Sequence, residues 1–223
     1  TLAAARVTAI RELLAAARGR LAAVEFASPR EAHLLLRHVL GVGEASLLAR
    51  DDEAVRDDDA RRFEELIERR LAGEPVAYLV GSKEFYGRPF VVDNRVLVPR
   101  PETEHLVEAA LALAKSLRGR PRIPDLGTGS GCIAVTLALE LPESRVVATD
   151  VSPAAVAVAR RNARALGARV DFLGARWSAP LHAERFDLVV SNPPYLDPTG
   201  EVQPEVARWE PASALWGGAA RRA

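Results

Sequence analysis

The sequence predicts an α/β protein in which a small helical domain and a β-hairpin connector precede a larger domain built on a parallel sheet. Three observations support this fold class. Apolar residues recur at helical spacing within residues 1–73. Residues that favour strands, punctuated by glycine and proline, concentrate between 74 and 100. From residue 122 onward, short apolar runs alternate with helical patterns, as they do in βαβ units.

The predicted helical domain covers residues 1–73, and several amphipathic helices account for it. The helix predicted for residues 59–71 has an apolar side chain on every turn and ends before Gly73. Leu2, Ile10, Leu13 and Leu14 share one face of the first predicted helix, and the positions expected to face inward on the helix at residues 59–71 are Phe63, Leu66, Ile67 and Leu71.

The predicted connector, residues 74–100, contains one or two hairpins. Residues 101–223 then form the predicted sheet domain, in which a helix opens at Pro101. Ser152 and Pro153 carry the signature of a helix start, since serine caps the first turn and proline suits its first position. Pro124 conflicts with this pattern, because proline inside a buried strand lacks the N–H group that a sheet ladder uses.

Composition limits the classes of function. The chain has 30 Lys and Arg residues against 30 Asp and Glu residues, so its net charge is zero. Proteins that bind nucleic acid or anionic membranes without specificity rely on excess positive charge, so we expect neither partner. A single cysteine, Cys132, allows no intrachain disulfide, which favours a reducing compartment such as the cytoplasm. The four histidines have no evident ligand partners, so no structural metal is expected.

A glycine-rich segment lies between the first predicted strand of the sheet and the helix after it. Residues 125–131 read Asp-Leu-Gly-Thr-Gly-Ser-Gly. Glycines let the backbone turn tightly and approach a ligand closely, and the start of the following helix presents free N–H groups. Asp150 ends the next predicted strand, where a carboxylate can accept hydrogen bonds from both hydroxyls of a ribose. Together the two elements predict a site for a ligand that contains a nucleoside.

The spacing of the glycines distinguishes two kinds of nucleoside-binding loop. Dinucleotide-binding folds carry Gly-x-Gly-x-x-Gly, whereas Gly127, Gly129 and Gly131 stand two residues apart and position 132 is Cys. This spacing, preceded by Asp125, resembles the first motif of class I S-adenosylmethionine (SAM) methyltransferases. The resemblance implies a Rossmann-like methyltransferase domain and SAM as the cofactor.

A second motif, Asn192-Pro193-Pro194-Tyr195, follows a predicted strand that begins at Phe186. The two prolines fix the backbone and end the strand. The Asn192 amide oxygen and a neighbouring backbone carbonyl can accept both hydrogens of an –NH₂ group, and Tyr195 offers a flat face to a planar group. An amide or exocyclic amino nitrogen is a poor nucleophile because its lone pair is delocalised. Two acceptors would favour its developing positive charge, so positioning and electrostatics would carry the methyl transfer without a general base.

The chain resembles the release factor glutamine methyltransferases, the HemK/PrmC family, over nearly its whole length. Asn-Pro-Pro-Tyr alone also occurs in adenine-N6 methyltransferases, whereas the connector and the Arg-Pro-Glu-Thr sequence are more specific. The segments that carry the resemblance are Gly73 to Tyr78, Glu84 to Gly87, Val98 to Glu104, the glycine-rich segment, Asp150, Ser191 to Tyr195, Glu210-Pro211 and Ala214-Leu215.

The resemblance implies that the protein methylates the side-chain amide nitrogen (N5) of the glutamine in the Gly-Gly-Gln motif of class I peptide-chain release factors, which end translation. It also implies that the helical domain recognises this protein substrate. The cofactor-binding residues expected are Asp125, Gly127, Thr128, Gly129, Ser130, Gly131, Asp150, Trp177 and Asn192. The catalytic residues expected are Asn192, Pro193 and Tyr195, and substrate binding is expected at Asn192, Pro193, Pro194 and Tyr195.

Two features depart from the family pattern. Family members often carry an acidic residue immediately before the position of Trp177, where this chain has Arg176. The family also continues beyond the position of Ala223 with the last strands of the sheet, so we expect the methyltransferase domain to be incomplete at this end.

Three other functions remain open from the residues alone. The protein could methylate glutamine in a ribosomal protein, or adenine N6 in DNA or RNA. Zero net charge and the lack of an evident basic recognition segment weigh against the nucleic acids. It could also bind SAM without catalysis, although the intact Asn192-Pro193-Pro194-Tyr195 sequence weighs against this alternative.

Overall fold

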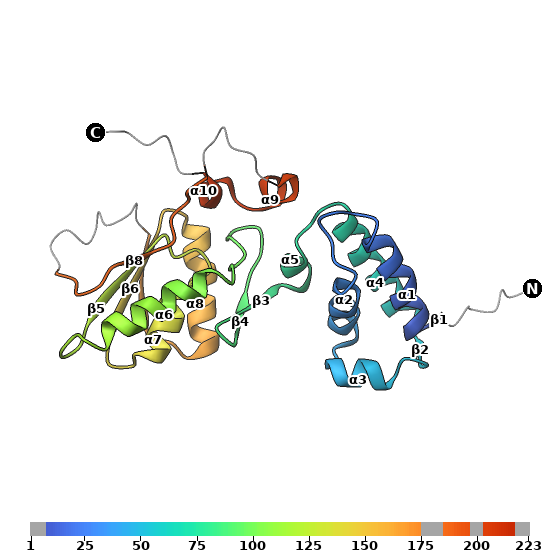
Figure 1. Ribbon diagram of the computed structural model, residues 1–223, viewed down its shortest axis with the longest axis horizontal. Helices are drawn as coiled ribbons and strands as arrows, with labels where there is room; N and C mark the ends of the chain where they lie inside the picture. The colour runs from blue at the N-terminus through green and yellow to red at the C-terminus, as the bar shows by residue number, and fades with distance from the viewer. Residues whose placement is uncertain (1–7, 175–184, 197–202, 217–223) are drawn as a thin grey trace, which may run out of the picture. The chain divides into compact units, whose positions relative to one another are not determined.

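A computed structural model describes residues 8–174, 185–196 and 203–216 of the chain (Figure 1). It divides the chain into two compact units, residues 1–80 and 81–223. The predicted connector, residues 74–100, is therefore shared between the two units. Trp177 and Arg176 lie outside the described residues.

The first unit is helical and has its own apolar core. Its elements are β1 (Thr8–Ala9), α1 (Ile10–Leu21), α2 (Glu31–Leu40), α3 (Glu44–Ala49), β2 (Ala54–Val55), α4 (Asp57–Leu71) and α5 (Val76–Val80). The two short strands pair antiparallel. The fully buried side chains of its core include Leu21, Leu35, Leu36, Phe63 and Ile67.

Helix α4 begins two residues earlier than the apolar spacing predicts. Its first turn consists of Asp57, Asp58 and Asp59. Carboxylates at this end of a helix are stabilised by the free N–H groups and by the positive end of the helix dipole. Asp57 and Asp58 therefore belong to the helix, which was predicted to begin at Asp59.

The second unit opens with a hairpin of β3 (Ser82–Phe85) and β4 (Arg88–Val91). The two residues between the strands, Tyr86 and Gly87, both have positive φ angles, +52° and +69°. Such a two-residue turn matches the twist of a hairpin, although positive φ is unusual for tyrosine. The Tyr86 N–H donates to the Glu104 carboxylate at 2.8 Å, which holds the turn in place.

A four-stranded parallel sheet in the order β7-β6-β5-β8 forms the centre of the second unit. Helices α6, α7 and α8 pack side by side, with α7 against the sheet (Figure 1). The remaining elements of this unit are α6 (Thr103–Ala114), β5 (Arg122–Leu126), α7 (Cys132–Glu140), β6 (Arg145–Asp150), α8 (Pro153–Leu166), β7 (Val170–Gly174), β8 (Val190–Ser191), α9 (Pro204–Trp209) and α10 (Ala212–Leu215).

Strand β8 is shorter than the sequence predicts, because it begins at Val190 and not at Phe186. It pairs with β5 only at Asp125↔Val190 and Leu126↔Ser191, whereas β5 and β6 pair over five positions. Pro124 precedes the first of these pairs and has no N–H with which to extend the ladder toward residues 186–189. Regular pairing therefore begins only after this proline, although one backbone hydrogen bond lies before it, from the Asp187 N–H to the Arg122 carbonyl oxygen at 3.1 Å.

Helix α8 starts where its sequence predicts. The Ala155 N–H donates to the Ser152 hydroxyl at 3.2 Å, Pro153 occupies the first turn, and Gly167 ends the helix with φ +72°. The predicted cap at Ser152-Pro153 is therefore confirmed. The apolar core between this layer of helices and the sheet includes Val107, Ile123, Ala134, Val135, Leu137 and Ala148.

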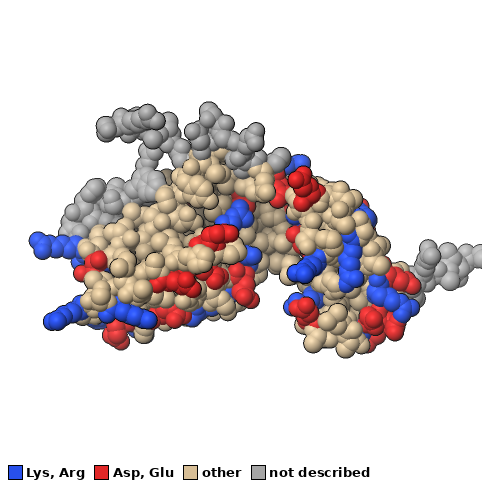
Figure 2. Space-filling model, viewed as in Figure 1, with Lys and Arg blue, Asp and Glu red and all other residues tan. Residues whose placement is uncertain are grey.

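Charged groups of both signs occur on each unit in the view of Figure 2. No helix among the described residues is long and apolar enough to cross a membrane.

Asn162 of α8 joins three parts of the second unit. Its side chain is 1% exposed. Its Oδ1 accepts from the Val91 N–H at 2.8 Å, and its Nδ2 donates to the carbonyl oxygens of Val91 (3.0 Å) and Ser130 (2.8 Å). The amide thus exchanges hydrogen bonds with the backbone of Val91 in β4, as a neighbouring strand would. It also holds the glycine-rich segment at the Ser130 carbonyl group.

Replacing Asn162 by alanine is expected to lower the free energy of unfolding by about 3 kcal/mol, because three backbone groups in a buried region lose their partner. Urea unfolding of the purified protein measures this loss. Asn94→Ala, which removes the same side chain at an exposed position, is the matched control and is expected to change stability by less than about 0.5 kcal/mol. Equal stability of both variants would contradict this account of Asn162.

Candidate active site

The glycine-rich segment connects the end of β5 to the start of α7. Gly127, Gly129 and Gly131 have φ angles of +76°, +55° and +82°, which glycine adopts without the steric cost that a Cβ would add. A Cβ built on Gly127 or Gly129 meets no atom within 4 Å. A Cβ on Gly131 would lie 2.9 Å from the Ala159 Cβ. Gly131 thus permits close packing of α7 on α8, while Gly127 and Gly129 leave open space for a ligand.

Asp150 at the end of β6 is held by two backbone groups. Its Oδ2 accepts from the Gly129 N–H at 2.9 Å, and its Oδ1 accepts from the Ser152 N–H at 2.9 Å. Each carboxylate oxygen retains capacity for a further hydrogen bond. The arrangement fixes the carboxylate beside the glycine-rich segment, where the sequence predicted it.

Asp125 lies behind the same segment and is fully buried. Its Oδ2 accepts from the Thr128 hydroxyl at 2.6 Å, which ties the turn of the loop to the strand below it. Burial raises the pKa of Asp125 from 3.8 to about 6, and the hydrogen bond from Thr128 opposes this rise. In this position the carboxyl group shapes the loop through Thr128.

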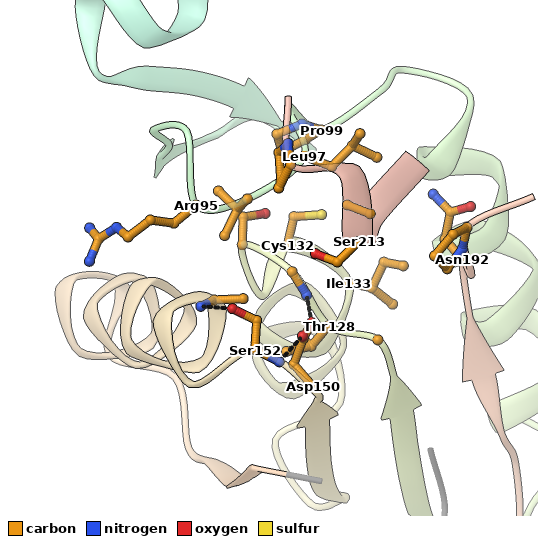
Figure 3. Close-up of a pocket in the computed structure, with 18 of the residues that line it drawn as sticks. Arg95, Leu97, Pro99, Thr128, Cys132, Ile133, Asp150, Ser152, Asn192 and Ser213 are labelled. Carbon is orange, nitrogen blue, oxygen red and sulfur yellow. Dashed lines mark hydrogen bonds between the residues drawn. The ribbon is translucent and has the colours of Figure 1, made fainter. Parts of the chain in front are cut away.

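A cavity of about 340 Å³ opens in front of this loop, within the size range of small-molecule sites. Figure 3 shows Thr128, Asp150 and Ser152 together on one side of the cavity and Asn192 on another. Of the residues predicted from the sequence, those that line it are Gly127, Thr128, Gly129, Ser130, Asp150, Asn192 and Pro194. Asp125, Gly131 and Pro193 are not among the lining residues, and Trp177 lies outside the described residues.

The Asn192-Pro193-Pro194-Tyr195 segment follows β8, and the last residue of this strand, Ser191, is held to β5 by a hydrogen bond. The Ser191 hydroxyl donates to the Leu126 carbonyl oxygen at 2.7 Å, so the segment leaves the sheet beside the glycine-rich loop. The Asn192 Nδ2 donates to the Thr103 hydroxyl oxygen at 3.2 Å. Tyr195 is 78% exposed. Its ring is therefore open to a partner.

A second cavity, of about 410 Å³, lies beside the first. Tyr195, Leu196 and Leu106 line it, but not the first cavity. The residues that line both cavities are Leu97, Arg100, Thr103, Asn192 and Ala214. The two cavities therefore meet at Asn192.

A buried carboxylate holds one wall of both cavities. The Glu210 side chain is 1% exposed, accepts from the Val98 N–H at 3.2 Å and pairs with the Arg100 guanidinium. The Leu196 N–H also donates to the Leu215 carbonyl oxygen at 3.2 Å. These contacts hold the segment around α10, which lines the first cavity through Ser213, Ala214 and Trp216, against residues 97–103.

Sequence reasoning predicted no individual role for Arg100, Thr103 or Glu210. In the sequence they were noted only as members of two segments that carry the family resemblance, Val98 to Glu104 and Glu210-Pro211. The partners stand far apart, since 110 residues separate Arg100 from Glu210 and 89 separate Thr103 from Asn192. No local pattern singles them out, because charged residues also stand beside proline at Glu74-Pro75, Arg88-Pro89 and Pro142-Glu143.

Cys132 begins α7 beside the first cavity and is 8% exposed. Burial raises the pKa of its thiol to about 12, so the thiol stays protonated at neutral pH and is a poor nucleophile. No group of three or more His, Cys, Asp or Glu side chains that could hold a metal ion occurs within residues 8–174, 185–196 and 203–216.

Comparison with known proteins identifies the fold of the second unit. Residues 103–208 match the family model described as the methyltransferase small domain. Residues 12–81 match the PrmC N-terminal domain. The parallel sheet, the glycine-rich loop after β5 and Asp150 after β6 are arranged as in a class I methyltransferase, and this is the fold of the unit.

Three similar proteins are release factor glutamine methyltransferases. The one from Neisseria gonorrhoeae is 50% identical over 169 residues, which are 75% of this chain and 61% of that protein. The one from Koribacter versatilis is 45% identical over 202 residues, 89% of this chain and 72% of that protein. The one from Geobacter sulfurreducens is 42% identical over 213 residues, 94% of this chain and 74% of that protein.

This chain belongs to the release factor glutamine methyltransferase family. It spans about three fifths of the length of two similar proteins, 61% of the one from Neisseria gonorrhoeae and 62% of the one from Bordetella pertussis.

The raised pKa of Asp125 gives an expected dependence of stability on pH. The folded state favours the protonated carboxyl, so the contribution of this group is fully present below about pH 4 and is lost as the pH rises through about 6. Asp125→Asn cannot ionise. The free energy of unfolding of wild type, relative to this variant, is therefore expected to fall between pH 4 and pH 7.

Urea unfolding at pH 4, 5, 6 and 7 measures this difference. Asp171→Asn, an exchange of an exposed carboxylate in β7, is the matched control. A difference between wild type and Asp125→Asn that stays constant across this pH range would contradict the assignment.

Proposed function

We propose that this protein transfers a methyl group from SAM to the side-chain amide nitrogen of the glutamine in the Gly-Gly-Gln motif of class I peptide-chain release factors. One observation carries the proposal: a cavity bounded by the glycine-rich loop and a second cavity bounded by Tyr195 meet at Asn192. SAM in the first cavity and the substrate glutamine in the second could therefore both reach the Asn192 side chain. Family membership supplies the release factor as the substrate.

The first cavity suits SAM. Gly127 and Gly129 leave room where side chains would project, and Asp150 can accept hydrogen bonds from the ribose hydroxyls. Asp125 supports this site through Thr128. The proposal also includes Trp177 as a residue that binds SAM, near its adenine ring.

Bound SAM supplies an electrophilic methyl group on a positively charged sulfur. The glutamine nitrogen attacks this carbon, the carbon–sulfur bond breaks and its electron pair stays on sulfur. One N–H proton then leaves the nitrogen for water. S-adenosylhomocysteine and N5-methylglutamine are the products.

Asn192 and the prolines after it would position the nitrogen. The Asn192 Nδ2 already donates to Thr103, which leaves Oδ1 to accept a hydrogen bond from the glutamine –NH₂ group. This acceptor favours the positive charge that develops on nitrogen as the new bond forms. Pro193 and Pro194 restrict the backbone of the same segment, so its carbonyl groups keep their direction.

Tyr195 and the second cavity would receive the part of the substrate that carries the glutamine. The exposed ring offers a flat surface to a planar amide, and Leu106 and Leu196 line the same cavity with apolar groups. A loop of a folded protein, with small residues beside its glutamine, can approach such a site. A substrate of this kind places the reaction in the cytoplasm, where translation ends.

The first experiment offers labelled SAM and the purified protein to a set of substrates in parallel. These are a class I release factor, its Gly-Gly-Gln→Gly-Gly-Ala variant, ribosomal proteins, DNA and RNA. Label in the intact release factor alone is the expected result. Label in ribosomal protein or nucleic acid would overturn the substrate, and label in no substrate would contradict the proposed activity.

The role of Asn192 is tested separately. Asn192→Ala removes the acceptor without reaching the glycine-rich loop, so methyl transfer is expected to fall by at least about a hundredfold. SAM binding, measured by calorimetry, is expected to stay within about threefold, because the loop and Asp150 remain. Asn94→Ala is the matched control, at an exposed position that lines neither cavity. Unchanged turnover in Asn192→Ala would contradict the role of this side chain.

A further inference from the structure

Thr103 is a buried polar residue that lines both cavities, at the first position of α6. It is 8% exposed, and its hydroxyl oxygen accepts from the Asn192 Nδ2 at 3.2 Å. So far it has entered the argument only as the acceptor of this hydrogen bond, with no part of its own in the reaction. Its hydroxyl group nevertheless contacts the side chain on which the proposed reaction depends.

The direction of the Asn192 amide matters because its two ends have opposite properties. Oδ1 accepts hydrogen bonds, whereas Nδ2 donates two. A rotation of the amide by half a turn would present N–H groups to the –NH₂ group of the substrate, which is itself a donor. That arrangement would repel the substrate nitrogen and would oppose its developing positive charge. A catalytic Asn192 therefore needs a partner that holds Nδ2.

The backbone around Thr103 is well placed to provide this partner. The Thr103 N–H donates to the Arg100 carbonyl oxygen at 3.0 Å. Arg100 pairs with the buried Glu210, which also accepts from the Val98 N–H. Glu210 thus holds Val98 and Arg100, and the backbone hydrogen bond to Arg100 ties Thr103 to them, so the hydroxyl group has a defined position beside Asn192.

We propose that Thr103 is a positioning residue for methyl transfer, and that its hydroxyl holds the Asn192 amide so that Oδ1 faces the substrate nitrogen. The inference rests on the proposed function, because it assigns Thr103 a part in that reaction. Thr103 acts through Asn192 and needs no contact with the transferred methyl group. Its loss should therefore slow the reaction without weakening the binding of either substrate.

Three variants test the proposal in the full chain, with SAM and a class I release factor as substrates. Thr103→Val keeps the branched shape and removes the hydroxyl, so kcat is expected to fall by about tenfold or more. KM for the release factor and Kd for SAM are expected to stay within about twofold. Thr103→Ser restores the hydroxyl and is expected to recover kcat to within about threefold of wild type.

Thr136→Val is the matched control for the loss of a buried hydroxyl. Thr136 lies in α7, is fully buried, and its Oγ1 has no hydrogen-bond partner among the described residues. Its replacement is expected to leave kcat unchanged. Thermal unfolding of all variants shows whether a lower rate reflects loss of structure.

A double variant isolates the contact itself. Adding Thr103→Val to Asn192→Ala is expected to lower kcat no further, because the amide that Thr103 would hold is already absent. An equal loss in both backgrounds would overturn the proposal, as would a Thr103→Val protein with the kcat of wild type or a Thr103→Ser protein as slow as Thr103→Val. Failure of the wild-type protein to label a release factor would overturn the proposed function itself, before any variant is compared.

Discussion

The parallel pairing of β5 with β6 and β8 is the constraint on which the site depends. Leu126 lies opposite Thr149 in one neighbour and Ser191 in the other, so all three strands end at the same edge of the sheet. The glycine-rich loop, Asp150 and Asn192 leave from these ends, although they are far apart in the sequence. Open α/β sheets bind their ligands at this edge for the same reason.

Carboxylates that accept from backbone N–H groups then fix the loops at this edge. Asp150 holds Gly129 and Ser152, and Glu210 holds Val98. The charge of each carboxylate strengthens these hydrogen bonds. The glycine-rich loop and residues 97–103 are therefore held in place before a ligand arrives, which lowers the ordering cost of binding.

Patterns that are local in the sequence predicted the fold, and they predicted seven of the residues that line the first cavity. The alternation of strands and helices, the glycine spacing and the Asn-Pro-Pro-Tyr motif each lie within a few residues, so their chemistry can be inferred without coordinates. The contacts of Thr103 with Asn192 and of Arg100 with Glu210 could not be inferred, because they join segments about a hundred residues apart. The start of β8 was predicted wrongly because its apolar run begins at Phe186, whereas Pro124 keeps regular pairing with β5 from starting before Val190.

The short ladder between β5 and β8 makes the two sides of the site mechanically unequal. The side that carries Asp150 is joined to β5 by five residue pairs, whereas the side that carries Asn192 is joined by two. Local opening of a sheet costs less where fewer backbone hydrogen bonds must break. The pairing of β5 with β8 is accordingly easier to open than the pairing of β5 with β6. The side of the site that carries Asn192, which would meet a protein substrate, can therefore move while the side that carries Asp150 keeps its shape.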